Sequence, residues 1–146
     1  MYVTRACIEQ VGLMDEHYFL FFEDLEWGIR AKRHFGIGYA HRSVVRHTGG
    51  TTIGSSIRFA RQSALSIYLE SRNSILFVRQ HFPNWLPWTI MVQCCRILLK
   101  SDLHRLGNVM VAFRGIVAGI RGQTGRPDEV LRRHNNTRGR DVEARS

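Results

Sequence analysis

The chain has 146 residues, of which 44% are hydrophobic, so it can form one domain with a core but not two sizeable ones. Its formal net charge of +9 points to an anionic partner: nucleic acid, an anionic membrane surface or a phosphorylated substrate. The basic residues form no dense block and no nucleic-acid-binding motif, which argues against nucleic acid. The three cysteines follow no disulfide or metal-binding pattern, which favours a reducing, cytoplasmic setting.

The first third of the chain is expected to mix strands and helices. Residues 1–3 are predicted to be a strand fragment, and Thr4 is expected to open a short helix that runs to Gln10. An aromatic run leads into a helix predicted over residues 23–35, with Gly36 as its C-cap. Residues 37–47 alternate loosely between apolar and polar side chains and are predicted to form a strand with a turn near residues 41–43. A glycine- and threonine-rich loop follows.

The rest of the chain is expected to be helical and then disordered. One long helix is predicted over residues 57–82, ended by Phe82-Pro83, and two more between Pro87 and Ile120. The segment Trp85–Lys100 combines an apolar face with flanking tryptophans and cationic residues. This pattern suits either a helix at a membrane interface or one that packs on the protein's own core. The polar tail after Gly122 is predicted to be mostly disordered.

Three carboxylates follow directly on the aromatic run Phe19–Phe22. Glu23, Asp24 and Glu26 lie at a helix start, where the helix dipole stabilises each of them by about 0.3–1 kcal/mol, and this is the simpler explanation. Apolar surroundings would instead raise a carboxyl pKa and suit it to general-base catalysis. Trp27 would add a flat apolar surface beside Asp24. Both interpretations stay open on the residues alone.

His47 precedes the loop Thr48–Ser56. A histidine at a strand end is usually a hydrogen-bonded surface residue. Before Gly49-Gly50, however, it stands where the backbone can approach a phosphate closely, and an imidazole there is a reasonable ligand for a divalent metal.

Three stretches together resemble the C-terminal half of bacterial family 2 glycosyltransferases, in particular the rhamnosyltransferase-like members that build surface polysaccharides. The stretches are GLMDEHYFLFFEDLEWGIRAK, YAHRSVVRHTGGTTIGS and YLESRNSILFVRQHFP, in this order. The resemblance covers residues 1–87. It implies an α/β fold, in which residues 1–56 are the C-terminal part of a Rossmann-like GT-A catalytic domain. The residue patterns themselves predict a mainly helical segment over residues 57–121, suited to association with a membrane, and a disordered basic and polar tail over residues 122–146.

The resemblance also implies roles for single residues. Asp24 matches the general base that deprotonates an acceptor hydroxyl as it attacks the anomeric carbon with inversion, and Glu23 is the second choice. Glu26 and Trp27 match positions that contact the acceptor sugar. His47 matches a ligand of the divalent cation, Mg²⁺ or Mn²⁺. A recurrent Arg-Asn pair corresponds to Arg72 and Asn73, for which a helix-packing role or a phosphate contact would both fit.

The N-terminal nucleotide-binding half of that family, with its D-x-D motif, is not found in this sequence. The chain is therefore expected to be the back half of an enzyme and to be inactive alone. In the complete enzyme, the partners would be a nucleotide-sugar donor, a lipid-linked or polysaccharide acceptor, and the cytoplasmic face of the cell membrane. The alternative is a non-catalytic peripheral membrane or protein-interaction module, in which the acidic motif is only a helix start.

Overall fold

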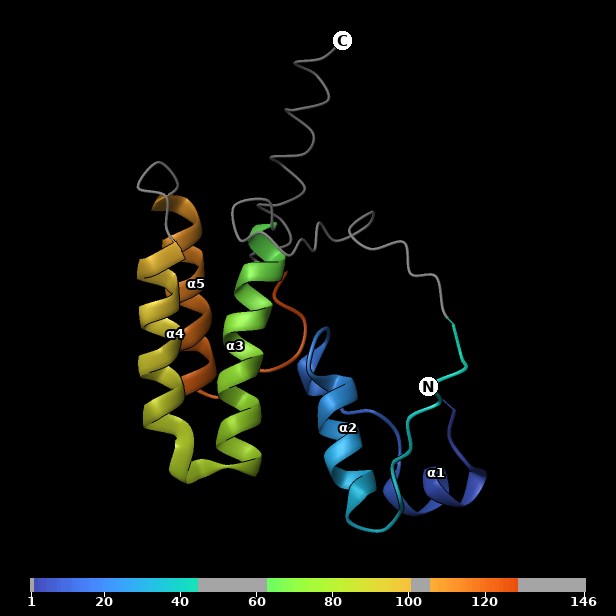
Figure 1. Ribbon diagram of the computed structural model, residues 1–146. Helices are drawn as coiled ribbons and strands as arrows, with labels where there is room; N and C mark the ends of the chain where they lie inside the picture. The colour runs from blue at the N-terminus through green and yellow to red at the C-terminus, as the bar shows by residue number, and fades with distance from the viewer. Residues whose placement is uncertain (1, 45–62, 101–105, 129–146) are drawn as a thin grey trace.

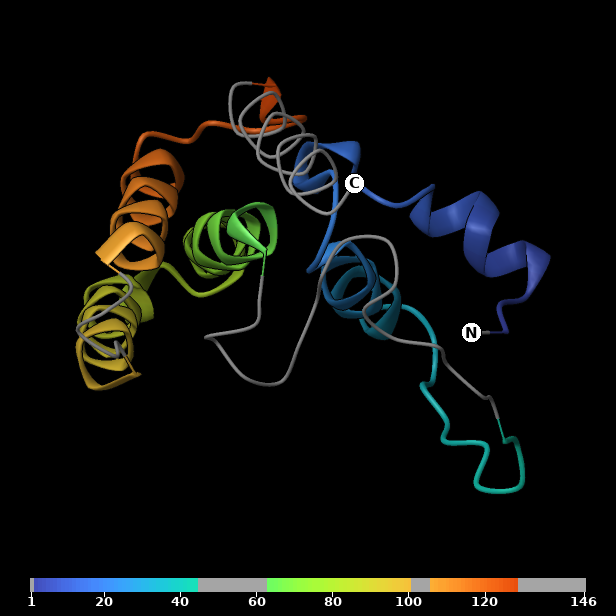
Figure 2. The same ribbon diagram turned by 90° about the horizontal axis from the view of Figure 1, so that it is seen from above.

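The computed structural model describes residues 2–44, 63–100 and 106–128, and over these residues the chain is helical. The elements in chain order are α1 (Arg5–Val11), the 3-10 turn η1 (Glu16–Tyr18), α2 (Glu23–Lys32), α3 (Ala64–His81), the 3-10 turn η3 (Pro83–Trp85), α4 (Leu86–Lys100) and α5 (Leu106–Ile120). Figure 1 shows α3, α4 and α5 side by side as a bundle, with α1 and α2 on the other side of α3. Seen from above, α3 lies between the α4–α5 pair and α2 (Figure 2).

Local capping explains where several helices begin and end. The Thr4 hydroxyl accepts a hydrogen bond from the Cys7 amide at 3.3 Å, which confirms the predicted helix start. The Ser63 hydroxyl caps α3 in the same way, accepting from the Ser66 amide at 3.1 Å. Phe82-Pro83 ends α3 as predicted, because proline cannot continue the helical hydrogen-bond pattern. Residues 57–62, the start predicted for this helix, lie outside the described residues.

Two apolar clusters hold the bundle together, and α3 contributes to both. Leu20 and Phe21, from the segment before α2, pack against the second cluster and so connect this segment to the bundle. A third, smaller cluster joins α1 to α2 through Cys7, Trp27 and Ala31. The buried members of the bundle clusters are Ile67, Ile75, Ile97, Ala112 and Ile116 in the first, and Leu65, Tyr68, Leu69 and Ala118 in the second.

Two glycines of α5 let its backbone approach α3 closely. A Cβ atom added at Gly115 would lie 2.5 Å from the Tyr68 carbonyl oxygen, and one at Gly119 would lie 2.7 Å from the Arg72 carbonyl oxygen. Both clashes involve backbone atoms, which cannot rotate away as a side chain can. The spacing of four residues places both glycines on the same face of α5, so this face is the contact with α3.

We expect Gly115→Ala to lower the free energy of unfolding by about 1–3 kcal/mol, because the added methyl group forces α3 and α5 apart. The gain in helix propensity, about 1 kcal/mol, offsets only part of this loss. Gly28→Ala in α2 is the matched control. A Cβ there meets no atom within 4 Å, so the same substitution should be neutral or stabilising. Chemical denaturation followed by circular dichroism measures both, and equal stabilisation by the two substitutions would contradict the close contact.

The predicted α/β, Rossmann-like GT-A fold is wrong for the described residues, which contain helices and turns but no strand or sheet. The described part of the predicted strand at residues 37–47 is irregular, with a turn at residues 41–42 as predicted, and its apolar side chains face solvent. Ile37 is 64% exposed, Tyr39 91% and Val44 87%. A strand needs a neighbouring strand to satisfy its backbone groups, and the described residues offer none. Val3 likewise lies outside any strand. The helix predicted over residues 23–35 ends at Lys32, and Arg33 rather than Gly36 is its C-cap.

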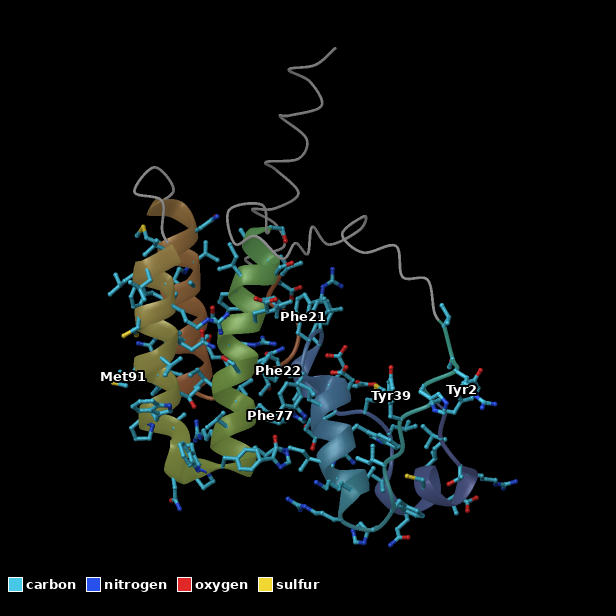
Figure 3. The ribbon with its side chains drawn as sticks, in the orientation of Figure 1. Tyr2, Phe21, Phe22, Tyr39, Phe77 and Met91 are labelled. Atoms are coloured by element: carbon cyan, nitrogen blue, oxygen red, sulfur yellow. The ribbon has the colours of Figure 1, made fainter. Side chains whose placement is uncertain are left out.

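Helix α4 is apolar on its outer side as well as on its core side. Ile97 faces the core, whereas Trp88, Met91 and Leu99 are exposed by 57%, 46% and 86%. Figure 3 shows Met91 on the side of α4 that faces away from α3. A search of the described residues finds no helix with the length and apolar character needed to cross a membrane.

Candidate functional site

The acidic motif is presented by an unusual turn. Phe19, Phe21 and Phe22 have φ angles of 61°, 66° and 73°, a region that bulky side chains seldom adopt. Each such residue costs about 1–3 kcal/mol and persists only where the surroundings hold it in place. The turn brings the chain into α2, with Glu23 as the first helical residue.

Two buried polar side chains of α3 hold this turn. The Asn73 amide nitrogen lies 2.9, 2.7 and 2.9 Å from the carbonyl oxygens of Tyr18, Leu20 and Phe21. Arg72 Nη2 donates to the Tyr18 carbonyl at 3.0 Å, and Arg72 Nε donates to the Asn73 side-chain oxygen at 2.9 Å. Arg72 is 1% exposed and Asn73 is fully buried, and burial lowers the pKa of the Arg72 guanidinium. Arg72 and Asn73, the predicted Arg-Asn pair, therefore support the fold by holding the turn before α2.

Aromatic packing supports the same turn. The rings of Phe22 and Phe77 are 5.5 Å apart, and both lie between α2 and α3 in Figure 3. The Tyr18 hydroxyl donates to the Gln80 side-chain oxygen at 2.9 Å. Burial, with the charges of Glu26 and Asp15, raises the pKa of Tyr18, so its phenol stays protonated and keeps this hydrogen bond. The turn is thus fixed to α3 along its whole length.

Glu23 and Asp24 line a cleft of about 650 Å³ between α2, α3 and α4. The Asp24 carboxylate is exposed and accepts a hydrogen bond from the Leu25 amide at 2.8 Å. Glu23 Oε2 is buried and has no hydrogen-bond partner among the described residues. The aromatic and apolar part of the lining comes from Met14, Phe21, Phe22, Leu25, Ile67 and Ile97. The cleft thus combines acceptor oxygens with apolar surface.

Polar side chains of α3 and α4 complete the lining: Glu70, Ser71, Ser74, Gln93 and Arg96. Gln93 donates to the Ser74 hydroxyl at 2.8 Å, and Ser74 in turn donates to the Ser71 carbonyl at 3.0 Å. Sequence reasoning missed these five residues. Gln93 was detectable as the one polar residue in the run Ile90–Cys95, but the sequence does not show that it faces the same space as Glu23.

Glu26 and Trp27 are not among the residues that line this cleft. Glu26 is fully buried, and its carboxylate oxygens accept from Arg30 Nε at 2.8 and 2.9 Å. His81 Nε2 lies 3.5 Å from the same carboxylate. The Trp27 indole donates to the Gly12 carbonyl at 2.8 Å. Both side chains therefore connect α2 to its neighbours, although the sequence prediction placed them at the acceptor.

The predicted metal ligand, His47, lies outside the described residues. Within the described segments, no group of three His, Cys, Asp or Glu side chains is arranged to hold a metal ion.

Comparison with known proteins gives one informative similarity. No protein-family model matches the chain, and no solved structure is significantly similar to it. The chain is similar to the low-salt glycan biosynthesis hexosyltransferase Agl10 of Haloferax volcanii, with 23% identity over 136 residues. The aligned region covers 89% of this chain and 43% of the relative, so the chain spans less than half the length of that protein. The similarity supports the resemblance to glycosyltransferases in general.

Proposed function

We propose that the chain is part of a glycosyltransferase of glycan biosynthesis and that the cleft between α2, α3 and α4 holds the acceptor. The observation that carries the proposal is the position of Glu23 and Asp24 at the wall of this cleft, at the end of a turn that Arg72 and Asn73 hold. The similarity to a hexosyltransferase supports the same reaction class.

The lining suits a sugar. Carboxylates, an amide and hydroxyls can bind the hydroxyl groups of a sugar, and the apolar side chains Phe21 and Phe22 can pack against the faces of its ring. Asp24 is the general base. Its carboxylate takes the proton from an acceptor hydroxyl while that oxygen bonds to the anomeric carbon of the donor, and the nucleoside diphosphate leaves with the bonding electrons. Attack from the face opposite the leaving group inverts the anomeric centre.

The groups that bind the other reactants lie outside the described residues. The nucleotide-sugar donor and a divalent cation belong there, in the manner of family 2 enzymes. The exposed apolar side of α4 supports a location at the membrane surface, on the cytoplasmic side, where a lipid-linked acceptor would be presented.

A membrane or interaction module without catalysis is the second candidate, favoured by that same exposed side of α4. The two candidates differ in whether the gene is needed for sugar transfer. Membranes from cells with and without the gene should be incubated with radiolabelled nucleotide-sugars, and label in the lipid or polysaccharide fraction measured. We expect incorporation from one donor to be lost on deletion and restored by the gene in trans. Equal incorporation from every donor would overturn the enzymatic proposal.

A further inference from the structure

Helix α4 has an apolar face on the side that points away from the bundle. The residues of this side recur at intervals of three or four, which places their side chains on one face of the helix. The opposite side packs on the core of the bundle through Leu86, Ile90 and Ile97. Met91 in Figure 3 marks the side that faces away from α3. We call this side the outer face, and its exposed residues are Trp88, Met91, Cys95 and Leu99.

The chemistry of the outer face suits lipid better than a protein partner. A protein–protein interface usually contains about one hydrogen bond per 100–200 Å² of buried area. The side chains of the outer face offer only the indole N–H of Trp88 and the weak thiol donor of Cys95. Hydrocarbon chains need no such partners, and burial of apolar surface is favourable in proportion to the area removed from water. The face therefore fits the boundary between lipid headgroups and acyl chains.

A second tryptophan and cationic residues accompany the outer face. Trp85 directly precedes α4 and is 62% exposed. Indole rings concentrate at membrane surfaces because they combine an apolar body with a polar N–H group. The sequence of α4 contains Arg96 and Lys100 but no acidic residue, so the helix itself is cationic. Anionic lipid attracts such a helix, which gives the outer face and its lipid partner complementary charge.

The length of α4 suits a helix that lies on a bilayer. Its 15 residues extend about 22 Å at a rise of 1.5 Å per residue, whereas the hydrocarbon core of a bilayer is about 30 Å thick. Its inner side is already packed against the core of the bundle. A helix that lies in the membrane surface needs to present only one apolar face to lipid, and α4 has one such face free.

We infer that the outer face of α4 inserts into the surface of an anionic bilayer, with the helix axis parallel to the membrane plane. Trp88, Met91 and Leu99 then reach the boundary of the acyl chains, and the exposed Arg96 lies at the headgroups. Arg96 also lines the cleft between α2, α3 and α4, so this cleft opens at the level of the headgroups. The inference deepens the proposed function: what the cleft holds there rests on that function, whereas the insertion does not.

The test measures binding of the intact chain to vesicles of equal parts phosphatidylcholine and phosphatidylglycerol by sedimentation. Trp88→Ser with Met91→Ser and Leu99→Ser removes three apolar side chains from the outer face and leaves the core contacts of α4 in place. We expect this triple variant to bind roughly tenfold more weakly or worse, because the apolar area that leaves water is lost.

The matched control is Leu13→Ser with Ile37→Ser and Tyr39→Ser. It also removes one aromatic and two aliphatic side chains, each at least 64% exposed, from the part of the chain around α1 and α2. The control should bind as the wild type does. An equal loss in both triple variants, or a wild-type chain that does not bind the vesicles, would overturn the inference. Circular dichroism establishes that both triple variants fold.

Fluorescence quenching distinguishes insertion from adsorption by charge alone. Bromine atoms on the acyl chains quench an indole only when its ring reaches those chains. We expect brominated vesicles to quench the tryptophan fluorescence of the wild type, and Trp88→Phe, a conservative substitution, to reduce the quenched fraction. Binding without quenching would contradict insertion.

Sedimentation equilibrium tests whether a second copy of the chain covers the face instead. Dimers that the triple variant at Trp88, Met91 and Leu99 abolishes, in a chain that binds no vesicles, would replace lipid by a protein partner. The proposed function fails separately. A chain that inserts as described, from a gene whose deletion leaves sugar transfer unchanged, would contradict only the glycosyltransferase proposal.

Discussion

Asn73→Asp is expected to lower the free energy of unfolding by about 3 kcal/mol or more, because an unmade buried hydrogen bond costs about 1–3 kcal/mol for each group. The substitution conserves shape but replaces the amide donor by an acceptor. The carbonyl oxygens of Tyr18, Leu20 and Phe21 would then lie 2.7–2.9 Å from a carboxylate oxygen in place of the amide nitrogen. A carboxylate oxygen cannot donate the hydrogen bonds that these carbonyls now accept. The turn before α2 would lose the contacts that hold its left-handed residues.

Urea denaturation measures this effect, and Asn84→Asp is the control. Asn84 is exposed in η3, so the same chemical change there should shift the free energy of unfolding by less than about 0.5 kcal/mol. A stability loss at Asn73 no larger than the loss at Asn84 would mean that the turn is held by other contacts.

Local signals in the sequence predicted the helices well. Thr4 and Phe82-Pro83 define helix ends through interactions between near neighbours, so the sequence suffices to place them. The strand predicted at residues 37–47 depended on a distant partner strand, which local alternation cannot reveal. The α/β fold was therefore a wrong inference from resemblance, since the described residues contain no sheet.

The site was predictable only in part. The acidic pair Glu23 and Asp24 was visible because three carboxylates after four apolar residues are uncommon. Whether Arg72 and Asn73 contact a phosphate or support the fold could not be decided, because their partners are backbone carbonyls more than fifty residues away. Glu70 and Arg96 join the cleft only through the packing of α3 and α4, which no local pattern records.

Asp24→Asn is expected to reduce glycosyl transfer by about 10²–10⁴-fold, the usual contribution of a general base. The amide has nearly the shape of the carboxylate and can still accept the hydrogen bond from the Leu25 amide, so the fold should persist. Glu23→Gln should have a smaller effect, because Glu23 is the second choice as base. Glu9→Gln, which changes an exposed carboxylate of α1, should leave transfer unchanged.

The most direct measurement is the amount of glycan product made by cells in which the gene's own copy encodes Asp24→Asn. Mass spectrometry quantifies the product, and immunoblotting establishes that the variant accumulates as the wild type does. The proposed role of the cleft predicts that the product falls to the level of the gene deletion, while the Glu9→Gln cells make the normal amount. Product within twofold of wild type in the Asp24→Asn cells would contradict that role.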